Sequence, residues 1–172
     1  CDENMRDAAR KLGEDPDELP ATYADIINKS IEGRPDDMAI SVHMCRGNAQ
    51  SQWFASGGYE AIAEQVFTLT KVDGFFLEYD DERSGGFEPL RFVPKGGPKI
   101  VLGLLTTKRG EMEPRDEILR RIEEASKYVD VDQLCLSPQC GFSSNAIGNL
   151  ISVDEQVAKL RNIVEIADEV WG

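Results

Sequence analysis

The chain alternates short apolar runs with helix-like segments, and this alternation restricts the possible folds more than any other feature of the sequence. Four runs have the length and composition of buried β-strands, and they span residues 38–45, 74–79, 100–105 and 134–137. The third run is almost wholly aliphatic, as expected for a strand with both faces buried. A regular succession of strand, loop, helix and strand predicts parallel βα units.

Helices are expected at 4–12, 22–32, 59–68 and 115–129, and the clearest one begins at Ser152. Ser152 and Glu155 have the spacing of a capping box, in which each side chain bonds the other residue's backbone N–H. Apolar residues then recur at helical spacing up to Trp171, which predicts one buried face. The residues of this predicted face are Val157, Leu160, Ile163, Val164 and Ala167.

We therefore predict an α/β fold of the (β/α)8 TIM-barrel type, of which four βα units form about half. Half a barrel exposes sheet edges and an apolar interior, so it needs a second half, and self-association is one way to supply it. The chain begins with Cys1, and its first residues already resemble the interior of a protein. We accordingly expect it to be a fragment of a longer protein.

Composition restricts the partners and the compartment. A net charge of -13 opposes nucleic-acid binding, because phosphate contacts need a basic surface. The longest aliphatic run is too short to span a bilayer, so no membrane is expected. Four cysteines are too few for a disulfide scaffold, although an even number permits two bridges. A reducing, cytoplasmic location fits better.

Metal-type donors stand where the predicted strands end: His43, Cys45, Glu78 and Cys140. His43 and Cys45 are two residues apart on a strand, so their side chains point to the same face. In (β/α)8 barrels the rim at the strand ends carries the chemistry. Imidazole, thiolate and carboxylate suit zinc, and a catalytic site keeps one position open. A zinc-bound thiol is deprotonated, which makes it a nucleophile.

Each donor also has a simpler interpretation. A His–x–Cys pair can occur by chance, although His43 is the only histidine. Glu78 borders an acidic loop that could merely be solvated, but it directly ends an apolar run, where an ionised carboxylate must be paired or metal-bound. Cys135 is expected to be a small core residue. Trp53 and Phe54 could either line a substrate pocket or pack on the barrel.

Three segments, taken in order, resemble the C-terminal catalytic barrel of cobalamin-independent methionine synthase, above all its shorter bacterial homologues. They are His43-Met44-Cys45, Leu77-Glu78-Tyr79 and Leu136-Ser137-Pro138-Gln139-Cys140-Gly141-Phe142. The resemblance runs from about Met38 onward and implies that residues 1–172 supply the C-terminal half of a zinc-dependent (β/α)8 barrel.

The resemblance also implies a cofactor, a reaction and the roles of four residues. His43, Cys45, Glu78 and Cys140 would bind Zn²⁺, and Glu78 would be the catalytic ligand that the substrate sulfur displaces. The implied enzyme is a methyltransferase that moves a methyl group from a 5-methyltetrahydrofolate-type donor to homocysteine and so forms methionine. A thiolate is a far better nucleophile than a thiol, which agrees with this chemistry.

The chain departs from the family pattern at two places. The histidine that the synthase carries after its next strand is replaced by Thr106-Thr107-Lys108-Arg109. The acidic residue before the last ligand is Gln139, and Phe142-Ser143-Ser144 stand in place of basic residues. Lys108 or Arg109 could receive an anionic substrate group or simply be surface charges.

These departures keep two other functions open. One is a zinc-dependent thiol alkyltransferase with another electrophile, either an epoxide or a corrinoid methyl donor. The other is a non-catalytic zinc or redox domain, which would have a closed site without an exchangeable position.

Overall fold

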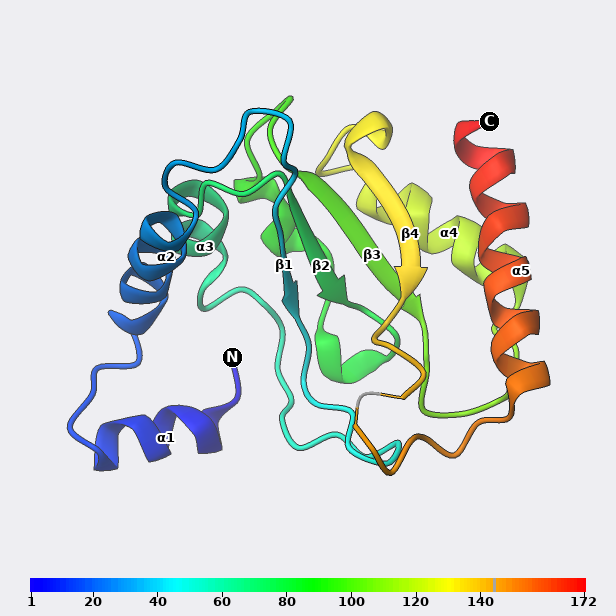
Figure 1. Ribbon diagram of the computed structural model, residues 1–172, viewed down its shortest axis with the longest axis horizontal. Coiled ribbons are helices and arrows are strands. Elements are labelled where there is room, and N and C mark those ends of the chain that lie inside the picture. Colours follow the sequence, from blue (N-terminus) through cyan, green and yellow to red (C-terminus); the bar gives the residue numbers. More distant parts are fainter. Residues whose placement is uncertain (144) are drawn as a thin grey trace.

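The computed structural model describes residues 1–143 and 145–172, and a sheet of four parallel strands forms its centre (Figure 1). The strands lie side by side in chain order: β1 (Ser41–Met44), β2 (Gly74–Glu78), β3 (Lys99–Leu105) and β4 (Leu134–Pro138). The α/β fold and its four parallel βα strands are therefore as predicted. The first run was predicted too long, because β1 covers only half of residues 38–45.

In the part of the chain that the structure describes, five α-helices and three short 3₁₀ helices connect and flank the strands. The α-helices are α1 (Glu3–Lys11), α2 (Leu19–Ser30), α3 (Ala63–Leu69), α4 (Arg115–Ala125) and α5 (Val153–Trp171). The 3₁₀ helices are η1 (Glu82–Ser84), η2 (Glu88–Phe92) and η3 (Val131–Gln133). α2 begins three residues earlier than predicted, since Pro20 is tolerated in a first helical turn. Among the described residues, no helix combines the length and apolar composition needed to cross a membrane.

The core lies between the sheet and the helices behind it. Phe75 and Leu77 of β2 point to this side and are buried, and six successive residues of β3 are buried as well. Phe67 of α3 packs edge-to-face on Phe75 with ring centroids 5.2 Å apart. Burying a side chain of this size contributes about 1.5–3 kcal/mol, so this layer holds the strands in place.

α5 has the predicted capping box but buries a different face. The Ser152 hydroxyl accepts from the Glu155 N–H, and a Glu155 carboxylate oxygen accepts from the Ser152 N–H. The buried residues of the helix are Lys159, Ile163 and Ile166. The predicted face was wrong at Val157, Leu160 and Val164, which are 40–57% exposed. The physical reason is the Lys159 ammonium, which turns inward to the Glu113 carboxylate at 2.8 Å and fixes which side of the helix faces the sheet.

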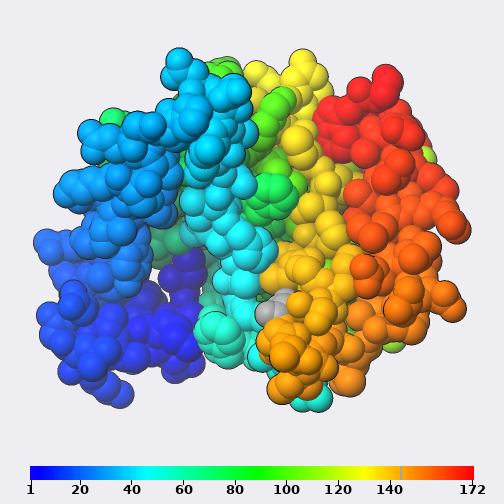
Figure 2. All heavy atoms as spheres, in the orientation of Figure 1, coloured from blue at the N-terminus to red at the C-terminus, as the bar shows by residue number. Residues whose placement is uncertain are grey.

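Both flanks of the sheet expose apolar surface. On the β4 side, Val153, Val157, Leu160 and Val164 form an exposed stripe along α5. On the β1 side, an apolar groove runs between α1, α2, β1 and α3, and Figure 2 shows the hollow beside the first helices. Phe76 of β2 is 38% exposed, whereas its neighbours Phe75 and Leu77 are buried, so the face of the sheet opposite the core also exposes apolar surface.

Gly103 provides a test of how closely the strands are fitted at the rim. A Cβ atom added there would lie 2.8 Å from the Leu77 carbonyl oxygen and 3.0 Å from the Gln139 Cα atom. Because both obstacles are backbone, we expect Gly103→Ala to lower the free energy of unfolding by about 1–3 kcal/mol in urea titrations. Gly74→Ala is the control, since its Cβ would meet nothing closer than 3.5 Å. Equal stability of the two variants would contradict the close fit.

Candidate metal centre

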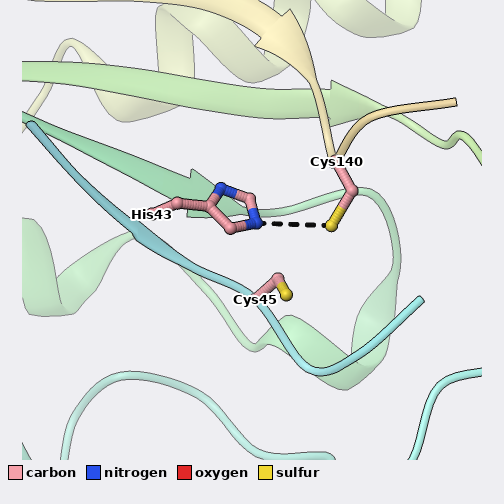
Figure 3. A group of neighbouring side chains, drawn as sticks. All are labelled: His43, Cys45 and Cys140. Carbon is pink, nitrogen blue, oxygen red and sulfur yellow. Dashed lines mark hydrogen bonds between the residues drawn. The ribbon is translucent and has the colours of Figure 1, made fainter. Parts of the chain in front are cut away.

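Three of the four predicted ligands meet at the carboxyl-terminal rim of the sheet (Figure 3). His43 lies in β1, Cys45 follows its end, and Cys140 follows the end of β4. Their ligand atoms all lie within 4.8 Å of one another, and His43 Nε2 is 3.3 Å from Cys140 Sγ. The two cysteines are free, as is every other cysteine of the chain.

The curvature of the sheet makes this meeting possible. β1 and β4 are the two edge strands, with β2 and β3 between them. In a flat sheet they would lie about 14 Å apart, because neighbouring strands are spaced at about 4.8 Å. Side chains from the two edges touch only if the sheet curls and both point into the concave side. The site therefore depends on barrel-like curvature as well as on the identity of the residues.

The donor set fits a zinc ion. Zinc takes imidazole nitrogen at about 2.0–2.1 Å and thiolate sulfur at about 2.3 Å, so tetrahedral N and S ligands lie about 3.6 Å apart. The 3.3 Å separation of His43 Nε2 and Cys140 Sγ is close to this value. One imidazole and two thiols leave a fourth position, which is the pattern of catalytic zinc sites. The residues present can thus hold zinc with little rearrangement.

Hydrogen bonds among the three side chains shift the pKa of each one. Hydrogen bonds from Cys140 and His43 lower the pKa of Cys45 to about 4. The same contact with Cys45 raises the pKa of Cys140, and hydrogen bonding to Cys45 raises the pKa of His43. Cys45 is therefore the sulfur that carries the negative charge most readily.

Glu78, the fourth predicted ligand, lies outside this group of three. Its side chain is completely buried at the end of β2, and three donors hold its carboxylate. The Arg46 backbone N–H donates to Oε2, while Arg83 Nη2 at 3.1 Å and Lys108 Nζ at 3.3 Å donate to Oε1. A carboxylate that ends an apolar run was expected to be either paired or metal-bound, and in the structure the Glu78 carboxylate is paired.

Tyr59 and Arg46 form the support beneath Glu78. The Tyr59 hydroxyl accepts from the Glu78 N–H and donates to the Met44 carbonyl, both at 2.8 Å. The Arg46 guanidinium lies 4.3 Å from the centre of the Tyr59 ring and donates to its hydroxyl. Burial raises the pKa of Tyr59 to about 12, so the phenol stays neutral and can serve as both donor and acceptor.

The segment after β3 is built into the site. Lys108 is 7% exposed and bonds Asp80 at 3.1 Å as well as Glu78, so the surface-charge interpretation was wrong for this residue. Arg109 is exposed, in agreement with that interpretation. The Asp80 side chain is 1% exposed and pairs with Lys108, so it is not solvated in an acidic loop. Ser144, named among the departures from the family pattern, lies outside the described residues.

Several residues of this network were missed by sequence reasoning. Arg46 directly follows the His43–Cys45 pair, and this adjacency could have identified it. Tyr59 and Arg83 have no local signal, because their partners are distant in sequence. Trp53 is half exposed, with the Arg83 guanidinium 4.6 Å from its ring centre. Phe54 is 67% exposed, and its ring lies against Gly47.

Comparison with known proteins places the chain in a family. A model of the "Cobalamin-independent synthase, Catalytic domain" family matches residues 20–169. The chain therefore belongs to this family, as the order of the His–x–Cys, Glu and Cys motifs predicted.

Individual relatives are considerably longer than the chain. It is 54% identical over 166 residues to the uncharacterized protein YxjH of Bacillus subtilis, covering 96% of this chain and 44% of YxjH. A methionine synthase of Pyrococcus abyssi is 27% identical over 128 residues, covering 74% of this chain and 33% of that protein. A solved structure of a candidate vitamin-B12 independent methionine synthase from Listeria monocytogenes superposes with a TM-score of 0.74 at 44% identity, covering 93% of this chain and 43% of that one. The chain thus spans less than half the length of these relatives.

Replacing Lys108 tests whether the buried charges depend on one another. Lys108→Met leaves Asp80 and Glu78 with one cation fewer in a buried setting. Breaking a buried ion pair from one side typically costs about 3–5 kcal/mol, and we expect a loss of that size in urea unfolding. Arg109→Met, at the exposed neighbour, should change stability by no more than about 0.5 kcal/mol. A Lys108→Met protein as stable as wild type would show that the network carries little energy.

Proposed function

We propose that the chain is the catalytic part of a zinc-dependent methyltransferase that activates a thiol. The proposed reaction transfers a methyl group from a 5-methyltetrahydrofolate-type donor to homocysteine and gives methionine. The observation that carries the proposal is the convergence of His43, Cys45 and Cys140 within 4.8 Å at the rim. Membership of the cobalamin-independent synthase family and similarity to the Pyrococcus abyssi methionine synthase support it.

Each ligand has a distinct role in this proposal. His43, Cys45 and Cys140 would hold zinc permanently, because the edge strands fix all three. Glu78 is proposed as the fourth ligand, and it is exchangeable because Arg46, Arg83 and Lys108 offer its carboxylate another set of partners. Bound zinc would supply a Lewis acid that keeps a substrate thiol deprotonated at neutral pH. The four free cysteines suit the reducing cytoplasm that we propose as the compartment.

We further propose that residues 1–172 act as the C-terminal half of a closed barrel. The two edge strands, the groove beside β1 and the apolar stripe on α5 lie on the two flanks where further βα units would pack. Self-association of two halves is the alternative way to cover these surfaces. Because a barrel site draws on several strands, activity is expected only when both flanks are covered.

A second candidate function differs in the electrophile. The three residues directly after β3 are buried, and Lys108 is held by two carboxylates, so none of Thr106, Thr107 and Lys108 is free to protonate a folate leaving group. An epoxide or a corrinoid-bound methyl group would not need such an acid. This observation is the reason to keep a zinc-dependent thiol alkyltransferase of one of these two kinds as the second candidate.

Metal content is the first test of the site. After zinc reconstitution and dialysis, wild-type protein should hold close to one zinc per chain by atomic emission. Cys140→Ser should lose most of it, because one of three fixed ligands is changed. Cys135→Ser, on β4 but outside the ligand group, should retain it. Retention of zinc by Cys140→Ser would refute the assigned ligand set.

Substrate exchange separates an enzyme from a closed structural site. In cobalt-substituted protein, homocysteine should change the visible spectrum, whereas methionine or serine should not. An unchanged spectrum at saturating homocysteine would favour the non-catalytic domain. Supplying methyl-folate, an epoxide or a methylated corrinoid protein together with the thiol would then identify the donor by the thioether formed.

A further inference from the structure

A second buried polar network leads from the loop after β1 to the sulfur of Cys140. Its members are Asn48, Thr107 and Gln139, which come from three different rim segments and are at most 6% exposed. Asn48 Nδ2 donates to Thr107 Oγ1 at 2.8 Å, and Thr107 Oγ1 donates to Gln139 Oε1 at 3.2 Å. Gln139 Nε2 donates to Cys140 Sγ at 2.8 Å. The Glu78 network does not include these three residues.

Each bond in this network fixes the direction of the next one. An amide nitrogen can only donate, so the Thr107 oxygen accepts from Asn48 and its single hydrogen goes to Gln139. The Gln139 carbonyl oxygen is thereby engaged, and its NH₂ group is left facing the sulfur. Asn149 Nδ2 bonds the Thr107 carbonyl at 3.0 Å, and the Gln139 N–H bonds the Leu105 carbonyl at 2.7 Å. Burial keeps water from competing for these groups.

We propose that Gln139 is a positioning residue that lowers the electron density on the Cys140 sulfur, so that Cys140 remains a ligand and is not alkylated in place of the substrate. The proposal rests on the proposed function, because it presumes a site that transfers alkyl groups to sulfur. Such a site contains two sulfur atoms of its own, Cys45 and Cys140. An alkyl group that reached either one would inactivate the site.

The physical basis is the hydrogen bond to the Cys140 sulfur, which would be anionic once zinc is bound. An N–H that donates to a charged acceptor forms a stronger bond than one between neutral groups. Hydrogen bonds to a ligand sulfur withdraw its charge and tune the metal site. The Gly47 backbone N–H also bonds Cys45 and is one of the contacts that lower the pKa of that thiol. The sulfurs of Cys140 and Cys45 therefore each accept a hydrogen bond from the protein, which lowers their reactivity toward an alkylating agent.

The cobalt-substituted protein gives a direct readout of charge on sulfur. The sulfur-to-cobalt charge-transfer band should move to longer wavelength in Gln139→Leu and in the nearly isosteric Gln139→Met, because neither side chain has a hydrogen-bond donor. Thr107→Val should shift the band less in the same direction. The Gln139 side chain would keep its NH₂ donor and lose only the Thr107 hydroxyl that orients it. Gln156→Leu, on α5, is the control and should not shift it. Unshifted bands in cobalt-bound Gln139 variants would overturn the proposal.

Chemical modification tests the protective role without assaying turnover. Methyl iodide added to the zinc-loaded protein alkylates a ligand sulfur when the S–C bond forms and iodide leaves. Peptide mass spectrometry should show Cys140 methylation rising about 2- to 10-fold in Gln139→Leu, as expected for the loss of one hydrogen bond. Equal rates in the variant and wild type would contradict the protective role.

A metal-free measurement separates this proposal from the proposed function. If the protein binds no metal, the proposed function fails while the Gln139 bond can still be examined. In reduced, metal-free protein, the NMR signal of one Gln139 Nε2 proton should be displaced from that of exposed glutamines and should move in Cys140→Ala. A Gln139 signal that Cys140→Ala leaves unchanged would rule out the bond to sulfur, and with it the proposal.

Discussion

The rim of this sheet depends on the burial of one carboxylate. Glu78 has no exposed surface, yet it ends a strand whose neighbours are all apolar. A buried charge of this kind is tolerated only when it is paired and hydrogen-bonded. The three donors come from the loops after β1, β2 and β3, so satisfying Glu78 also fixes these loops relative to one another. Two further residues extend this network: Asp80 accepts from Lys108, and the Tyr59 hydroxyl accepts from the Glu78 N–H.

The metal-type donors lie on a frame that this network has already fixed. Cys45 immediately precedes Arg46. The Arg46 backbone N–H donates to the Glu78 carboxylate, and the Arg46 guanidinium donates to the Tyr59 hydroxyl. Cys140 immediately follows Gln139, which is held by a separate buried network. The curvature of the sheet then brings the ends of the edge strands β1 and β4 together, so that His43 contacts Cys140. Hydrogen bonds from neighbouring groups orient the ligands of a metal site, and the buried bonds beside Cys45 and Cys140 can orient these donors in the same way.

Sequence reasoning succeeded where the signal was local. The strand runs, the capping box at Ser152 and the family motifs are all contained in short windows. The structure has a strand or helix in each predicted window, although β1, α3 and α4 are shorter than predicted. Sequence reasoning failed where the partner was remote. Lys159 pairs with Glu113 46 residues away and turns α5, so the predicted apolar face is partly exposed. Lys108 pairs with carboxylates 28 and 30 residues away, so a residue expected at the surface is buried.

The sequence by itself determined the class of fold, the family and the identity of the donor residues, because periodicity and motif order are properties of consecutive residues. Only the tertiary structure decided which donors meet. It brought together His43, Cys45 and Cys140, and it gave the Glu78 carboxylate to Arg83, Lys108 and a backbone N–H. The physical reason is that sheet curvature and the pairing of buried charges link residues far apart in the chain, and no short window of sequence contains both partners.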